Sequence, residues 1–234
     1  MVAATVQYTK PWPLRKAALT AGIGYLLMMC TPFCEFYAFP KLVVPGNAAQ
    51  TISQVSAHEG LLRAAILGYL INFVGDLLAL WSLYYLLRPV HSALSAFTAL
   101  LRFVYTMISL VALLHLLHIP GLLQHTEISA MGDRDTSILR ELSQFRSDWS
   151  FGYIFFGFHL ILLGWLCFRS HYIPKWIGIF LALAGFGWLL DNLRPIAFPS
   201  LQINFIFIMI AGLGELVFMI WLLVRGRLIQ EPGE

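Results

Sequence analysis

Six long apolar segments, separated by short polar or proline-containing stretches, dominate the chain. They cover residues 17–37, 61–87, 93–117, 149–168, 173–190 and 203–224. A membrane span needs about 20 predominantly apolar residues. A lone apolar segment in lipid must satisfy its own backbone hydrogen bonds, which a helix does. The pattern therefore predicts an all-α integral membrane protein with a single bundle of six transmembrane helices.

The basic residues divide between the two sides of this predicted bundle. One side carries Lys10, Arg15, Lys16, Arg88, Arg169, Lys175, Arg225 and Arg227, and the other carries Lys41, Arg134, Arg140, Arg146 and Arg194, with Arg63 near its edge. The first side is denser and its connecting loops are short, as on the cytoplasmic face of membrane proteins. We therefore predict cytoplasmic termini: residues 1–16 precede a transmembrane domain at 17–226, and residues 227–234 form a tail.

The loops predicted on the outer side are longer and carry structural signals of their own. Pro45-Gly46-Asn47 in the first outer loop indicates a turn. Residues 119–148 contain an apolar set, Ile138, Leu139, Leu142 and Phe145, interleaved with Arg140, Glu141 and Arg146. This pattern predicts a short amphipathic helix lying in the membrane interface, or a lid over a cavity. Residues 192–202 contain two prolines and are expected to form an irregular turn.

Composition agrees with a membrane location. Hydrophobic residues make up 59% of the 234 residues and charged residues 12%, against about 25% charged in soluble domains. The mean hydropathy is +0.76. The net charge of +3 is small, and its surplus cations lie at helix ends, so the chain is not expected to bind nucleic acid. Membrane lipid is the expected surroundings, and the sequence identifies no protein partner.

Four predicted helices each carry one strongly polar residue at the same depth. Asp76, Arg102, His159 and Glu215 lie ten to twelve residues from a basic or histidine residue at the cytoplasmic boundary. At about 1.5 Å per residue, that is roughly 15–18 Å, the middle of a core about 30 Å thick. Ionisable groups at this depth are costly and mark functional sites by default. We expect the four side chains to meet inside the bundle.

The pairing of these groups follows partly from topology. A tight loop makes the second and third helices antiparallel neighbours, so Asp76 is expected to pair with Arg102. Glu215 is then left to pair with His159 or to be protonated, because burial disfavours a carboxylate. Asn72 lies one turn from Asp76, and Tyr105 belongs to a polar stripe around Arg102. These six residues are the candidate ligand-binding or proton-relay set, although a purely structural ion pair would use the same side chains.

Glycines recur in the fourth and fifth predicted helices. Gly157, Gly164, Gly178 and Gly185 are interpreted as sites of close helix approach, because small residues let helix backbones come together in membranes.

No recognisable catalytic motif or cofactor-binding motif is present, so no enzyme class is assigned and no cofactor is predicted. His115 and His118 are three residues apart, a spacing that places two metal ligands on one helix face. A third ligand could come from His125, Glu127 or Asp148, but interfacial histidines usually face headgroups. The sequence therefore predicts no metal site, with His115 and His118 as the weak candidates.

The chain resembles a bacterial family of six-helix membrane proteins catalogued as domain of unknown function 4386. The resemblance rests on the order and spacing of segments 42–49 (LVVPGNAA), 59–63 (EGLLR), 88–90 (RPV), 156–159 (FGFH), 163–164 (LG), 168–170 (FRS), 172–175 (YIPK), 214–216 (GEL) and 221–226 (WLLVRG), with Asp76, Arg102, Gly178, Gly185 and Asp191 between them. His171 departs from the small residue expected there. The resemblance implies six helices in a bacterial cytoplasmic membrane and places Asp76, Arg102, His159 and Glu215 in the family pattern. It implies no activity.

Three hypotheses follow for the function. The first is a midplane site for a small polar or amphipathic ligand, with proton-coupled transport as one form of it. In that hypothesis Arg102 holds an anionic group of the ligand or Asp76, while Glu215 and His159 exchange protons. The second is a non-catalytic membrane scaffold or sensor subunit. The third is a membrane enzyme acting on a lipid or quinone, which needs a lateral opening from the bilayer.

Overall fold

Long helices account for nearly all of the described residues, 12–124, 131–197 and 205–229, in a computed structural model of the protein. The helices are α1 (Leu14–Met28), α2 (Cys30–Phe33), α3 (Phe39–Leu42), α4 (Ala48–Ala57), α5 (Glu59–Leu87), α6 (Ser92–Gln124), α7 (Met131–Arg169), α8 (Lys175–Ala197) and α9 (Phe205–Val224), with a π-helical turn η1 (Cys34–Ala38) and a 3₁₀ turn η2 (Gly226–Leu228). The described part contains no strand, so the all-α prediction is confirmed.

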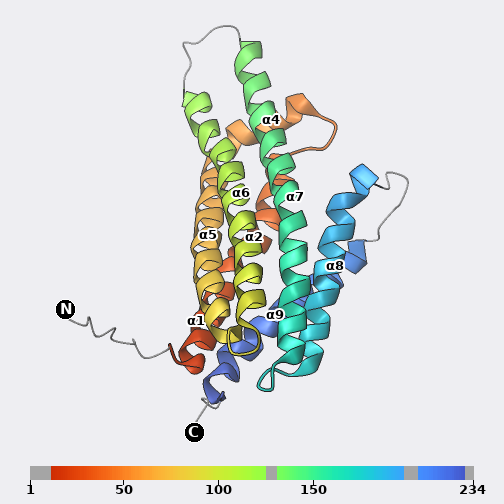
Figure 1. Cartoon of the computed structure of the whole chain (residues 1–234). Helices are drawn as coiled ribbons and strands as arrows, with labels where there is room; N and C mark the ends of the chain where they lie inside the picture. Colours follow the sequence, from red (N-terminus) through yellow and green to blue (C-terminus); the bar gives the residue numbers. More distant parts are fainter. Residues whose placement is uncertain (1–11, 125–130, 198–204, 230–234) are drawn as a thin grey trace, which may run out of the picture.

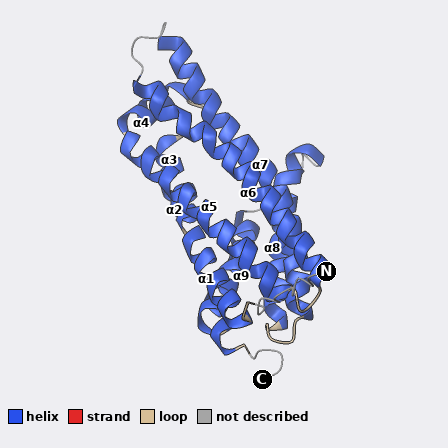
Figure 2. Ribbon diagram, turned by 60° about the vertical axis from the view of Figure 1, so that its left-hand side comes forward, coloured by secondary structure: helices blue, strands red, loops and turns tan. Residues whose placement is uncertain are grey.

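The long helices form a ring, shown from two directions in Figures 1 and 2. Packing runs from α1 to α5, α6, α7, α8 and α9, and α9 returns to α1. The beginning of α1 and the end of α9 meet, because Arg15 Nε donates a hydrogen bond of 2.7 Å to the carbonyl of Ile229. The N-terminal and C-terminal ends of the helical domain therefore lie at the same end of the ring.

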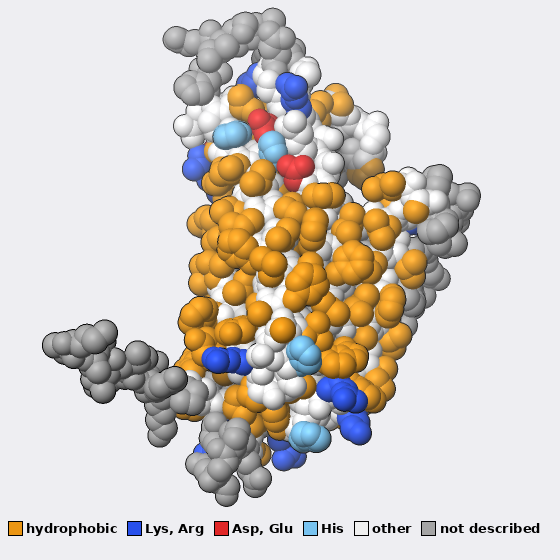
Figure 3. Space-filling model, in the orientation of Figure 1, with side chains coloured by type: hydrophobic (Ala, Val, Ile, Leu, Met, Phe, Trp, Pro, Cys, Tyr) orange, Lys and Arg blue, Asp and Glu red, His pale blue; other side chains and the backbone are white. Residues whose placement is uncertain are grey.

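Five stretches are long and apolar enough to cross a membrane: Leu14–Leu42, α5, α6, the part of α7 at Arg134–Arg169, and α8. The sixth predicted span corresponds to α9. Its part at Leu213–Val224 is an apolar helix that is by itself shorter than a membrane span. Figure 3 shows a broad hydrophobic belt, with basic and histidine side chains at one end and charged and histidine side chains at the other. Large apolar side chains face outward in this belt, including Leu67, Trp81 and Phe97. Exposed apolar surface of this extent indicates a multi-pass membrane protein.

The first apolar segment, predicted as one helix at 17–37, is one helical stretch from Leu14 to Leu42 whose regular α-helical hydrogen bonding is interrupted at Met29 and at the π-turn η1. Pro32 and Pro40 explain the breaks, because proline lacks the N–H that bonds four residues back and its ring clashes with that carbonyl. The first break, at Met29, lies just before Pro32, and η1 lies just before Pro40. A π-turn widens the helix locally and often occurs at functional sites.

The amphipathic segment of the third-to-fourth connection is not a separate interfacial helix, so that prediction is wrong. It is the outer part of α7, which runs unbroken from Met131 to Arg169. Ile138, Leu142, Phe145 and Trp149 are buried against the extended end of α6 and the α3–α4 region. Their helical spacing continues directly into the membrane segment, and no glycine or proline interrupts residues 134–151. A continuous helix is the result.

Of the two other connections predicted on the outer side, one contains the predicted turn and the other differs from the prediction. The predicted Pro45-Gly46-Asn47 turn is present, with Gly46 at a φ of 76°. Asn47 then caps α4, since its side chain accepts a hydrogen bond from Gln50 N. At the next outer connection α8 continues through Pro195 to Ala197, where an irregular turn was predicted. Residues 198–202 of that connection lie outside the described part.

The buried apolar side chains fall into two clusters. One cluster includes Leu14, Ala21 and Leu163 and lies toward the end of the ring where α1 begins and α9 ends. The other includes Leu62, Leu116 and Phe145 and lies toward the opposite end. Asn72, Asp76, Arg102 and His159 belong to neither cluster and are themselves buried. The ring therefore encloses a polar region in addition to its apolar core.

Candidate functional site

Asp76 and Arg102 form a buried salt bridge in the ring. Arg102 Nη2 lies 2.7 Å from Asp76 Oδ1, and the side chains are 0% and 1% exposed. The pairing predicted from the tight α5–α6 loop is therefore confirmed. Removing two charges from water is expensive, and their attraction offsets that cost only when further hydrogen bonds satisfy both groups.

The hydrogen bond from Arg102 Nη1 fixes the tautomer and the charge of His159. Arg102 Nη1 lies 3.1 Å from His159 Nε2. A guanidinium has donors only, so His159 Nε2 must accept, and the proton is on Nδ1. His159 Nδ1 is 2.9 Å from the carbonyl oxygen of Thr98, which accepts that proton's hydrogen bond. His159 is thus a neutral imidazole held between α6 and α7, and not the partner of Glu215 that the sequence suggested.

The broken first span supplies the remaining partners of this network. Arg102 donates from Nη1 to the Tyr25 hydroxyl at 3.4 Å and from Nη2 to Met28 Sδ at 3.0 Å. Thr31 donates to Asn72 Oδ1 at 2.8 Å, and Asn72 Nδ2 donates to Asp76 Oδ2 at 3.1 Å. Arg102 Nε is the one guanidinium nitrogen left without a hydrogen-bond partner. Every other charged atom of the pair is engaged.

These partners have only a weak signature in the amino-acid sequence. Tyr25, Met28 and Thr31 recur at helical spacing within the first apolar segment, but none of them is ionisable at neutral pH, so the search for charges passed over them.

Glu215 stands apart from this network on the inner face of α9. Its helical neighbours Phe218 and Leu222 are buried, whereas Glu215 itself is half-buried. The Trp188 indole N–H of α8 donates to Glu215 Oε1 at 3.4 Å. Among the described residues no cation forms an ion pair with Glu215, although its charge and that of Arg102 are near enough to interact.

Trp188 connects Glu215 to a cluster of aromatic rings. Trp188 stacks on Tyr153 of α7 with ring centroids 4.3 Å apart. Tyr105, a predicted site residue, is buried and packs on Tyr153 at 6.0 Å and Phe156 at 4.7 Å. Tyr153 and Trp188 are half-buried even though they lie on inward helix faces. The sequence search missed both residues because aromatic positions in a span usually indicate packing.

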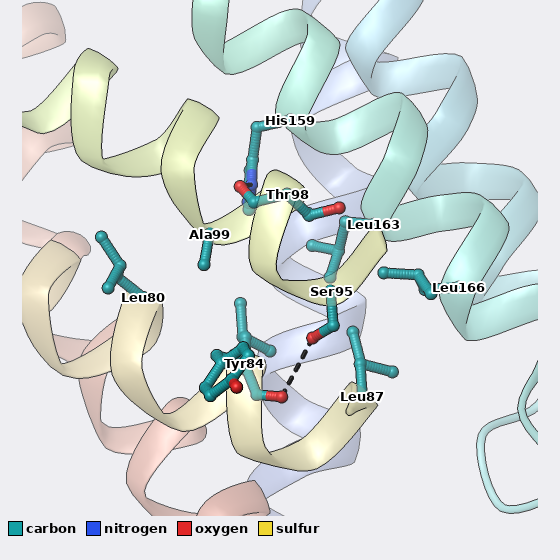
Figure 4. A pocket seen from close by; sticks show the side chains of 10 residues that line it. Leu80, Tyr84, Leu87, Ser95, Thr98, Ala99, His159, Leu163 and Leu166 are labelled. Atoms are coloured by element: carbon teal, nitrogen blue, oxygen red, sulfur yellow. Dashed lines mark hydrogen bonds between the residues drawn. The ribbon is translucent and has the colours of Figure 1, made fainter. Parts of the chain in front are cut away.

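A small cavity adjoins His159 on the side of the α5–α6 loop (Figure 4). Its lining is mainly apolar, with Leu80, Leu83 and Leu163 among the lining residues. Its volume of about 10 Å³ is at the lower limit for one water molecule. The hydroxyl of Ser95 at this cavity donates to the Tyr84 carbonyl at 2.9 Å. This space is too small for a ligand that would contact Arg102.

The weak metal candidates lie in a different network toward the C-terminal end of α6. His115 contacts Glu141 Oε2 through Nδ1 at 2.6 Å and Asp148 Oδ2 through Nε2 at 3.2 Å. His118 Nδ1 is 3.5 Å from Glu141 Oε1. His125 and Glu127, the other suggested ligands, lie outside the described residues. Within the described part of the chain no group of three or more such side chains is arranged to hold a metal ion.

One more carboxylate joins the first span to α7, and the sequence analysis did not single it out. Glu35, in the π-turn, accepts from the Tyr69 hydroxyl at 2.5 Å and from Arg146 Nη1 at 2.6 Å. The Arg146 guanidinium also lies 4.6 Å from the centre of the Phe39 ring. The position of Glu35 inside the predicted span at 17–37 was the feature of the sequence that could have identified it.

The family relationship can be read directly from comparison with known proteins. The model of the family described as domain of unknown function (DUF4386) matches residues 20–226. The chain belongs to this family. It is also 32% identical over 167 residues to an uncharacterized protein of the archaeon Archaeoglobus fulgidus, covering 71% of this chain and 86% of that protein. No solved structure matches significantly. The matched region contains all four midplane residues.

Proposed function

We propose that the chain crosses a bacterial cytoplasmic membrane six times, with both termini in the cytoplasm. We further propose that it binds a small polar or amphipathic molecule beside Glu215, with proton exchange at that carboxyl. The single observation that carries this proposal is the contrast between the two parts of the polar layer. Asp76, Arg102 and His159 are bonded to one another, whereas Glu215 has only an indole N–H as its described polar partner.

This division revises the roles expected from the sequence. Arg102 holds Asp76, so it is not free to hold an anionic group of a ligand. His159 accepts a guanidinium hydrogen, so protonating Nε2 would turn a hydrogen bond into a repulsive contact between two cations. Glu215 remains as the group that can change its charge or its partner. A carboxylate in this setting is expensive, and binding a proton or a ligand relieves that cost.

The ring itself favours ligand access from within the bundle. Tyr153, Trp188 and Glu215 come from three successive helices, α7, α8 and α9. They are linked by the Tyr153–Trp188 stack and the Trp188–Glu215 hydrogen bond, and each keeps part of its surface exposed. Side chains on an inner face stay accessible only where neighbouring helices do not close over them. This arrangement supports a site open to small molecules, in preference to a sealed structural core.

Proton movement in proteoliposomes tests the proposal. Vesicles that contain the protein and an internal pH-sensitive dye are placed under a proton gradient, and amphipathic cations, anions, zwitterions and neutral compounds are added in turn. We expect at least one class to release protons through the wild-type protein and not through Glu215→Gln. If no class separates the two proteins, or if Glu215→Gln only lowers thermal stability, the proposed function is wrong.

A further inference from the structure

The polar layer carries one surplus negative charge when Glu215 is ionised. Arg102 and Asp76 cancel each other in a salt bridge of 2.7 Å that is wholly buried. His159 adds no charge because its Nε2 accepts from the guanidinium. The Glu215 carboxylate is therefore the uncompensated member of the four. A buried charge must be paired or neutralised, so this site favours a positive ligand or a proton over an anion.

The rings beside Glu215 have the chemistry of a cation site. Trp188 donates its N–H to the carboxylate and stacks on Tyr153 at 4.3 Å. Phe156 meets Trp188 edge-on, with ring centroids 6.4 Å apart. Indole and phenol faces attract cations electrostatically, and indole does so most strongly. A carboxylate next to partly exposed tryptophan and tyrosine rings can hold the charge of a cation and its apolar body together.

We propose that the ligand of this site is an organic cation with an apolar body, and that it competes with a proton for Glu215. The inference rests on the proposed function and names its ligand class. The cation binds the ionised carboxylate, so lowering the pH weakens binding by protonating Glu215. The ionisable and polar groups near Glu215 on the packed helices are Tyr25 of α1, Asp76 of α5, Arg102 of α6, Tyr153 of α7 and Trp188 of α8.

Two ions of equal shape and opposite charge provide the probe. Tetraphenylphosphonium and tetraphenylborate are added to the purified full-length protein in detergent, and binding is measured by equilibrium dialysis with radiolabelled ions. We expect saturable binding of the phosphonium and none of the borate. Phosphonium affinity should fall about tenfold or more as the pH is lowered through the titration of the carboxyl group, because the protonated acid no longer attracts the cation.

Matched variants locate the site. Glu215→Gln should abolish saturable phosphonium binding, whereas Glu59→Gln, at an exposed glutamate paired with Arg63 at the start of α5, should leave it unchanged. Trp188→Phe should bind within a few-fold of wild type, and Trp188→Leu about tenfold more weakly, since it lacks an aromatic face. Size-exclusion profiles identify any variant that has not folded, and Glu215→Asp then serves as the second carboxyl variant, expected to keep cation binding.

The outcomes separate this inference from the proposed function. If the borate or a neutral compound binds in a Glu215-dependent manner and the phosphonium does not, the ligand class is wrong while the proposed function stands. Phosphonium binding that survives in Glu215→Gln overturns the assignment of the carboxylate as the cation site. If no class of compound distinguishes wild type from Glu215→Gln in proteoliposomes, the proposed function and the ligand class fail together.

Discussion

Arg102 is the residue that organises the interior of this protein. Its guanidinium holds Asp76 of α5, His159 of α7 and two side chains of α1. It also lies 5.6 Å from the centre of the Phe156 ring. A guanidinium suits this position because its planar array of donors can bond several acceptors in different directions. The cost of burying one charge is thereby shared among four helices.

A double-mutant cycle on the buried pair tests this role. We expect Arg102→Met to lower the free energy of unfolding by about 3–5 kcal/mol, because Asp76 would keep an uncompensated buried charge. Asp76→Asn should destabilise for the same reason. The double variant should lose clearly less than the two single losses added together. Unfolding in mixed detergent micelles measures all four proteins, and strictly additive losses would contradict a coupled pair.

At the scale of helices, α7 and α8 approach so closely that only glycine fits between them. Gly157 lies opposite Gly185, and Gly164 lies opposite Gly178, two contacts one heptad apart in antiparallel register. A Cβ added at Gly164 would lie 2.5 Å from the carbonyl oxygen of Gly178. The packing predicted for these four glycines is confirmed. Close approach here sets the positions of His159 on α7 and Trp188 on α8.

Substitution of one of these glycines should therefore be costly. Gly164→Ala is expected to lower the free energy of unfolding by about 1–3 kcal/mol, because the added methyl group forces the two backbones apart. Gly121→Ala in α6 is the matched control, since nothing lies within 4 Å of its added Cβ. It should be neutral or slightly stabilising, as alanine favours a helix over glycine. Equal losses of stability in both variants would contradict the importance of close α7–α8 packing at Gly164.

For the whole molecule, a closed ring returns the chain to the end where it began. The polypeptide enters at α1 and leaves after α9 at the same end of the bundle, where Arg15 contacts Ile229. At the opposite end, α7 extends beyond the other helices (Figure 1). A membrane around the hydrophobic belt would leave this extension outside and the short loops inside, which agrees with the distribution of basic residues.

Cysteine labelling of intact cells tests the proposed topology. Arg88→Cys, Arg169→Cys and Glu59→Cys are made singly after Cys30, Cys34 and Cys167, which are all free thiols, have been changed to alanine. A membrane-impermeant maleimide should label the protein at position 59 from outside the cell. It should reach positions 88 and 169 only after the membrane is opened. Labelling of position 88 or 169 in intact cells would reverse the orientation.

The amino-acid sequence was sufficient to predict the helical membrane class and the C-terminal boundary of α5 at Leu87. Hydrophobic length and the spacing of charges are local properties of the chain. The sequence also predicted the Asp76–Arg102 pair, because the short loop between α5 and α6 makes these two helices antiparallel neighbours. It did not determine that α7 extends through the predicted loop, since an amphipathic stripe suits a membrane surface as well as another helix.

The hydrogen-bond partners within the polar layer depend on how the helices pack in three dimensions. Tyr25 and Met28 of α1 and Thr31 of α2 complete the shell around Arg102 and Asp76, because α1 and α2 pack against α5. His159 joined Arg102 and not Glu215 because α7 packs directly on α6. Side-chain partners depend on helix rotation and neighbour order, which no single segment encodes. That choice left Glu215 beside Trp188, with no ion-pair partner among the described residues.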